Sequence, residues 1–151
     1  MISIIIYLTA IVVANLTLLW FGAVASIYNA FILIGLDLSL RDKLHDQWQG
    51  KNLWLKMLIL ICGGSAITVA LNWDALPIAI ASATAFLAAG IGDALLYAKL
   101  RNYKFLIRSN GSNVVGSALD SIIFPTMAFG VLMPEIVIAQ FLAKIFGGGI
   151  W

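Results

Sequence analysis

The sequence predicts an all-α, polytopic membrane protein built as a compact bundle of six transmembrane helices. Of its 151 residues, 62% are hydrophobic and 11% are charged, and the mean hydropathy is +1.02. Soluble proteins contain about 25% charged residues, so a soluble domain of this length could not bury so much apolar surface. The apolar runs are long, which favours spanning helices over the short alternating strands of a membrane barrel.

The first apolar run, residues 2–36, is too long for one spanning helix. As a single helix it would extend roughly 52 Å, against a hydrocarbon core of about 30 Å. We therefore expect a break near Trp20-Phe21-Gly22 and two helices, over about 2–21 and 24–40. Trp20 then lies at a membrane interface, where tryptophan is enriched.

Each of these two helices carries a polar residue with two interpretations. Asn15 either bonds a neighbouring helix or contacts a ligand, and Asp37 is either a solvated interface residue or part of a site. Beyond Asp37 the segment 41–51 is polar, with Leu40, Leu44 and Trp48 spaced four apart. This spacing predicts a short helix lying on the membrane surface.

The third and fourth helices are expected over about 53–71 and 76–98, separated by a turn at Asn72-Trp73-Asp74. On the fourth helix, Asp93 shares a face with Ser82 and lies roughly 9 Å inside the basic segment that follows. The single histidine and single cysteine give no metal-binding pattern.

The fifth helix, expected over about 112–130, carries the densest polar pattern of the chain. Residues of one stripe recur at spacings of three and four: Asn113, Gly116, Ser117, Asp120, Ser121 and Phe124. Asp120 lies roughly 18 Å beyond Arg108, which puts a carboxylate near the midplane of a bilayer. Such a group faces either a functional cavity or a packing contact between helices. Pro125 is expected to kink this helix.

The sixth helix, expected over about 134–150, places Gln140 and Lys144 four residues apart. Lys144 lies roughly 15 Å from the start of this helix. It either extends to the nearer membrane surface or pairs with Asp120 on the preceding helix, since neighbouring helices pack about 8–10 Å apart. In the second case a solute that donates to Asp120 would compete with Lys144.

Loop charges predict the orientation. Lysine and arginine crowd the segments 41–51 and 99–108, and the turns after the first, third and fifth helices contain none. By the positive-inside rule both termini lie in the cytoplasm of a multi-pass protein of the inner membrane. No phosphate loop, paired-histidine zinc helix or Gly-x-Ser-x-Gly elbow is present, so we expect neither an enzyme nor a cofactor.

One segment resembles a known family. Residues 107–130, IRSNGSNVVGSALDSIIFPTMAFG, are similar to the signature of the vitamin-uptake, or queuosine-precursor, transporter family. Weaker similarities are Ala14-Asn15, Asp37, Gly92-Asp93 with Tyr97, and Lys144. The chain departs from the family at Ser39-Leu40-Arg41-Asp42, where members have a Glu followed by Tyr-Gly.

The resemblance implies a solitary relative of the substrate-binding subunits of energy-coupling-factor vitamin transporters. The implied substrate is a 7-deazapurine such as 7-cyano-7-deazaguanine. A carboxylate can accept the adjacent N–H groups of its guanine-like edge, and an aromatic ring can stack on it. The substrate-binding residues expected are Asp120, Asn113, Ser117, Asn15, Asp93, Phe124, Tyr97, Asp37, Gln140 and Lys144.

Two other functions stay open on the sequence. The chain could be a substrate-capture subunit that works only with an ATP-driven partner, or a membrane protein without transport activity, such as a phage assembly factor. The partners expected are the deazapurine and the lipid bilayer, without nucleic acid. The sequence leaves oligomerisation open.

Overall fold

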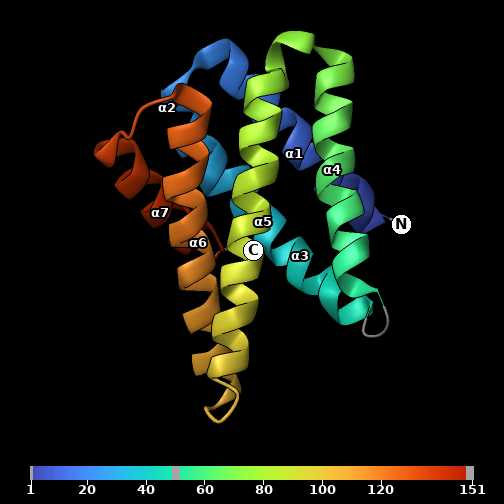
Figure 1. Cartoon of the computed structure of the whole chain (residues 1–151), viewed down its shortest axis with the longest axis vertical. Helices are drawn as coiled ribbons and strands as arrows, with labels where there is room; N and C mark the ends of the chain where they lie inside the picture. The colour runs from blue at the N-terminus through green and yellow to red at the C-terminus, as the bar shows by residue number, and fades with distance from the viewer. Residues whose placement is uncertain (1, 49–51, 149–151) are drawn as a thin grey trace.

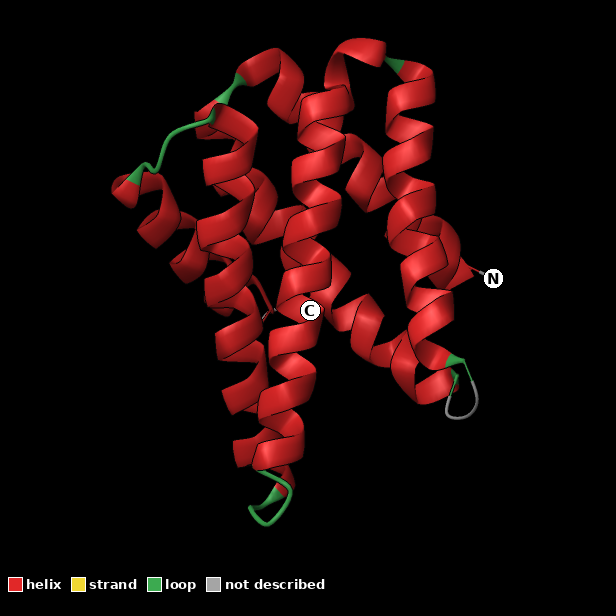
Figure 2. Ribbon diagram, viewed as in Figure 1, coloured by secondary structure: helices red, strands yellow, loops and turns green. Residues whose placement is uncertain are grey.

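The computed structural model describes residues 2–48 and 52–148, and its regular secondary structure there is entirely helical (Figure 2). The elements in chain order are α1 (Ile2–Phe21), α2 (Ala23–Asn29), η1 (Ala30–Ile34), α3 (Gly35–Gln47), α4 (Leu53–Leu71), η2 (Trp73–Ala75), α5 (Leu76–Lys99), α6 (Phe105–Phe129) and α7 (Pro134–Gly148), and Figure 1 labels the α-helices among them. Because α2, the π-helix η1 and α3 follow one another without a break, they form one long second helix. The fold is thus the expected all-α bundle of six helices.

The second helix is longer than the range 24–40 that its hydropathy predicts. It continues to Gln47, and Leu44 is only 1% exposed, in a core that includes Tyr7 and Met57. The prediction of a separate surface helix after Leu40 is therefore wrong. Polar residues dominate this stretch, but every fourth side chain remains apolar and packs inward, so the helix is extended by tertiary contacts.

The fifth helix also begins earlier than predicted. α6 starts at Phe105 rather than near residue 112, although serine, asparagine and glycine are weak helix formers. Packing on α5 outweighs this: Ser112 is buried, and a Cβ added at Gly111 would lie 3.1 Å from Leu100 Cδ1. α6 continues through the buried Pro125 to Phe129.

Glycines with positive φ mark two of the helix ends. Gly22, between α1 and α2, has φ +70°, and Gly130, after α6, has φ +71°. L-residues with a side chain rarely adopt this conformation, so both positions favour glycine. The break expected near Trp20-Phe21-Gly22 is thereby confirmed.

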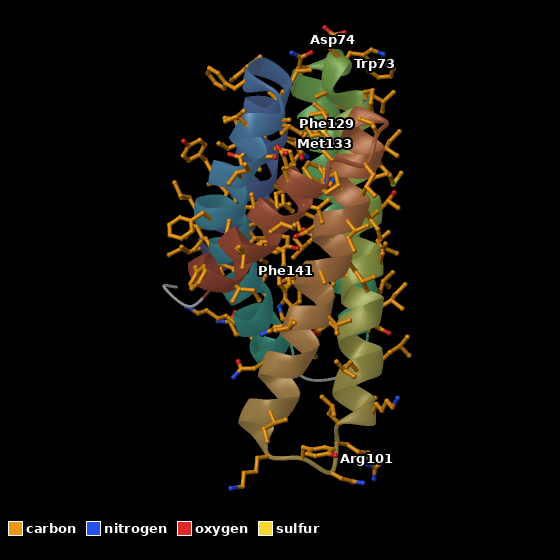
Figure 3. The ribbon with its side chains drawn as sticks, turned by 90° about the vertical axis from the view of Figure 1, so that its left-hand side faces the viewer. Trp73, Asp74, Arg101, Phe129, Met133 and Phe141 are labelled. Carbon is orange, nitrogen blue, oxygen red and sulfur yellow. The ribbon has the colours of Figure 1, made fainter. Side chains whose placement is uncertain are left out.

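The ends of α5 define the two ends of the bundle. Trp73 and Asp74 precede α5 at one end, and Arg101 follows it at the other (Figure 3). α6 returns beside α5 from the Arg101 end, as the two long neighbouring helices in Figure 1 show. The loops after the third and fourth helices therefore lie at opposite ends of the bundle.

Burial in this bundle differs from that in a soluble protein. Large apolar side chains such as Val24, Ile59 and Leu95 are more than half exposed, whereas Gln140 and Lys144 are buried. Within the described residues, two helical segments, 2–21 and 73–96, are long and apolar enough to cross a membrane, and 23–37 and 55–71 are shorter apolar segments. This distribution is typical of a helical membrane protein, whose exterior faces lipid.

The last helix packs backbone to backbone on the π-helix. α7 contacts α2, η1 and α3 on one side and α6 on the other. A Cβ added at Gly35 would lie 2.7 Å from the carbonyl carbon of Gly147, so neither glycine leaves space for a side chain. This close approach brings the polar residues of α7 into the middle of the bundle.

Candidate functional site

A buried ion pair joins α6 to α7. Lys144 Nζ lies 2.5 Å from Asp120 Oδ2, and the two side chains are 2% and 10% exposed. The pairing considered from the sequence is therefore present, and Lys144 does not extend to the surface. An ion pair with so little exposure is tolerated only where further hydrogen bonds satisfy its polar atoms.

Further hydrogen bonds extend from the ion pair to a third helix. The Lys144 ammonium also donates to Ser121 Oγ at 2.9 Å and to Gln140 Oε1 at 3.4 Å. Gln140 Nε2 in turn donates to Ser26 Oγ at 2.8 Å. The network thus connects α6, α7 and α2 through side chains that are all buried. Lys144 and Gln140 are four residues apart and lie on the same face of α7.

The ion pair faces a hollow between the helices, here called the first hollow. It is lined by Ala14, Asn15, Ser26, Asn29, Ala30, Ile34, Ser82, Phe86, Asp120, Phe124, Gln140 and Lys144. The space open to the centre of a water molecule is about 20 Å³, room for about one water. Two of the lining side chains are aromatic, one from α5 and one from α6.

A smaller hollow, here called the second hollow, also borders the ion pair. It is lined by Ile34, Phe86, Ala89, Gly116, Ser117, Asp120 and Lys144. Four residues line both hollows, and these include the two members of the ion pair. The two hollows are therefore adjacent and meet at Asp120 and Lys144.

Two asparagines supply amides to the first hollow. Asn15 Nδ2 donates to Thr68 Oγ1 at 3.4 Å, which connects α1 to α4. Asn29 Nδ2 donates to the Ala14 carbonyl at 3.0 Å and to Thr17 Oγ1 at 2.9 Å. Both side chains are oriented by these bonds, so their amides are fixed before any ligand binds.

The structure brings together six of the ten predicted site residues. Asp120, Asn15, Phe124, Gln140 and Lys144 line the first hollow, and Ser117 lines the second. Four predicted residues remain. The side chain of Tyr97 lies outside the described ones, and Asn113 and the buried Asp37 line neither hollow in the described part of the chain.

The fourth of these, Asp93, lies next to Gly116 rather than beside Asp120. Its Cβ would be 3.5 Å from a Cβ added at Gly116. One of its oxygens, Oδ1, is buried without a hydrogen-bond partner among the described residues. Asp93 thus lies close to the second hollow without lining it.

Several lining residues were not among the predicted site residues, notably Ser26, Asn29 and Phe86. Ser26 and Asn29 precede the π-helix, and Ile34 ends it. A π-turn shifts the phase of the helix, so a 3.6-residue periodicity assigns the wrong faces across it. Ser82 could have been predicted from the sequence, since it lies on the face of the fourth helix that carries small residues and Asp93.

The chain matches one family model. The family described as "Putative vitamin uptake transporter" matches residues 20–148. All residues lining the two hollows except Ala14 and Asn15 lie within that match. No curated protein and no solved structure matches the chain. Since the family model covers most of the chain, the protein belongs to this family of vitamin uptake transporters.

Proposed function

We propose that this membrane protein imports a queuosine precursor, a 7-deazapurine such as 7-cyano-7-deazaguanine, across the inner membrane. The proposal rests on Asp120. Its Oδ2 pairs with Lys144, whereas its Oδ1 makes no hydrogen bond to a described residue and belongs to a side chain that lines both hollows. A free carboxylate oxygen in a polar cavity is an acceptor for a solute with N–H groups.

The other lining residues suit a planar solute. A guanine-like edge presents adjacent N–H donors, which a carboxylate accepts as it does from a base. Phe86 and Phe124 line the same hollow and offer faces on which a bicyclic ring can stack. Asn15 can donate to a ring carbonyl, because its amide carries two N–H groups and one hydrogen bond, to Thr68, uses only one of them.

The first hollow must widen to admit such a solute. It has room for about one water, whereas pockets for small molecules typically enclose about 300–1,000 Å³. We assign the movement to α7, which supplies Gln140 and Lys144 to the wall. The chain enters this helix from α6 through the short segment 130–133, which begins at Gly130 with its positive φ.

The orientation follows from the loop charges and the bundle ends. Arg101 and Asp74 lie at opposite ends of the bundle (Figure 3), so with basic loops in the cytoplasm the Arg101 end is the inner one and the Asp74 end the outer one. Both termini are then cytoplasmic and all six helices span the membrane. The first hollow, with Ser82 and Phe124, lies toward the outer end of α5 and α6.

The test is uptake in cells that cannot make the precursor, with queuosine in their tRNA as the readout. The parent protein should restore queuosine when 7-cyano-7-deazaguanine is supplied, and Asp120→Asn should not. The matched control is Asp74→Asn, an exposed carboxylate at the end of the bundle, which should behave as the parent does. Equal activity of the two variants would contradict the role of Asp120, and co-purification of an ATPase module would contradict a solitary transporter.

A further inference from the structure

The Asp120–Lys144 pair separates the two hollows along the bundle. On α5, Ser82 belongs to the first hollow and Ala89 to the second; on α6, Phe124 belongs to the first and Gly116 to the second. Because α5 runs from the Trp73 end to the Arg101 end and α6 returns, the second hollow lies nearer Arg101 (Figure 3). The residues that line both hollows are Ile34, Phe86, Asp120 and Lys144, so a solute that moves from the first hollow to the second passes along the ion pair.

The Lys144 ammonium has no donor left for a solute. An ammonium carries three N–H groups, and Asp120, Ser121 and Gln140 accept from them. If Lys144 leaves Asp120, it keeps two neutral acceptors, one on α6 and one on its own helix. These two partners provide a second position for the ammonium, in which Asp120 is available to another donor.

We propose that Lys144 is an internal competitor of the solute at Asp120, and that its return to Asp120 releases the solute toward the second hollow. This inference rests on the proposed function. The solute's N–H groups and the ammonium require the same carboxylate, so each displaces the other. While Lys144 occupies Asp120, the solute cannot bind there. The apparent affinity for the solute is therefore the intrinsic affinity multiplied by the fraction of molecules in which the carboxylate is free.

Competition predicts effects of opposite sign, which neither direct contact nor a structural role would give. Without the ammonium, every molecule has a free carboxylate, so the solute should bind more tightly. Without a returning ammonium, nothing displaces the solute, so transport should slow. If Lys144 instead contacted the solute or held the fold, its loss would weaken binding and transport together.

The experiment compares binding and transport in the same purified full-length protein. Binding of 7-cyano-7-deazaguanine is measured by calorimetry in nanodiscs, and its uptake is measured in proteoliposomes. Lys144→Met should bind about tenfold or more tightly, since hydrogen bonds to charged groups are strong, and should transport at least tenfold more slowly. Lys99→Met, at the exposed end of α5, is the matched control and should change neither.

Other results of this experiment test the competition by Lys144 and the proposed function separately. If Lys144→Met weakens both binding and transport, or changes neither, the inference is overturned. If this variant does not fold, Lys144→Gln tests the same idea, because its neutral amide can still bond to Ser121 and Gln140 but competes for Asp120 without a charge. It should bind severalfold more tightly, and weaker or unchanged binding overturns the inference. A parent protein that binds no deazapurine overturns the proposed function itself.

Discussion

Replacing Asp120 with asparagine should separate the binding role of this residue from its structural role. The substitution preserves the shape of the side chain, removes its charge and replaces one acceptor oxygen with an amide that donates. A solute edge with two N–H groups then meets one acceptor and one donor. Hydrogen bonds to charged groups contribute about 1.5–3 kcal/mol, so binding of 7-cyano-7-deazaguanine should weaken by about ten- to a hundredfold or more.

The same substitution leaves Lys144 without its counterion. The Lys144 side chain is 2% exposed and its remaining partners, Ser121 and Gln140, are neutral. Removing one member of a buried pair typically destabilises a protein by about 3–5 kcal/mol, so the variant should also unfold at a lower temperature. The double variant Asp120→Asn with Lys144→Met removes both charges and should recover most of the lost stability, but not the binding.

Calorimetry with 7-cyano-7-deazaguanine and thermal unfolding in the same nanodiscs measure the two effects separately. The reasoning requires that the double variant be more stable than Asp120→Asn and still bind poorly. If Asp120→Asn binds as the parent does, then Asp120 serves only packing. If the double variant regains full affinity, the loss in the single variant came from instability rather than from the missing acceptor.

Three further predictions address topology, packing and the aromatic wall. After replacement of the exposed Cys62 with serine, a cysteine at Asn102 should be labelled only from the cytoplasm and one at Asp74 only from outside; labelling of both from one side would refute the orientation. Gly35→Ala should destabilise the protein by about 1–3 kcal/mol, because its Cβ would meet the Gly147 backbone. Gly63→Ala should not, because its Cβ would lie 4.0 Å from the nearest atom, Leu8 Cδ2. Equal unfolding temperatures of the two variants would contradict this close packing. Phe124→Leu should weaken deazapurine binding about five- to a hundredfold through lost stacking, and Phe146→Leu on the exposed face should not; equal affinities would remove Phe124 from the site.

The helical class and the ion pair could be predicted from the sequence for physical reasons. Long apolar runs specify spanning helices, because a lipid environment requires every backbone group to be bonded within its own segment. Asp120 and Lys144 were prominent because ionisable groups so far from polar sequence are rare and require a partner. Their positions on consecutive helices made each the natural partner of the other.

The shape of the hollow could not be predicted in the same way. The π-helix at Ala30–Ile34 leaves no periodic signal, and it changes which side chains of the second helix face the hollow. The helical extensions at Leu44 and Phe105 depend on contacts with other helices, and a hydropathy profile gives no information on such contacts. The position of Asp93 beside Gly116 likewise depends on how α5 and α6 pack, which separates it from Asp120.

The most direct measurement is uptake of labelled 7-cyano-7-deazaguanine into proteoliposomes that contain only the purified protein. The parent should give saturable uptake that an excess of unlabelled compound suppresses, and a folded Asp120→Asn protein should give at least tenfold less, in line with the loss of a charged acceptor. Uptake by the parent no greater than that of protein-free liposomes, or undiminished uptake by Asp120→Asn, would contradict a deazapurine importer that works through this carboxylate.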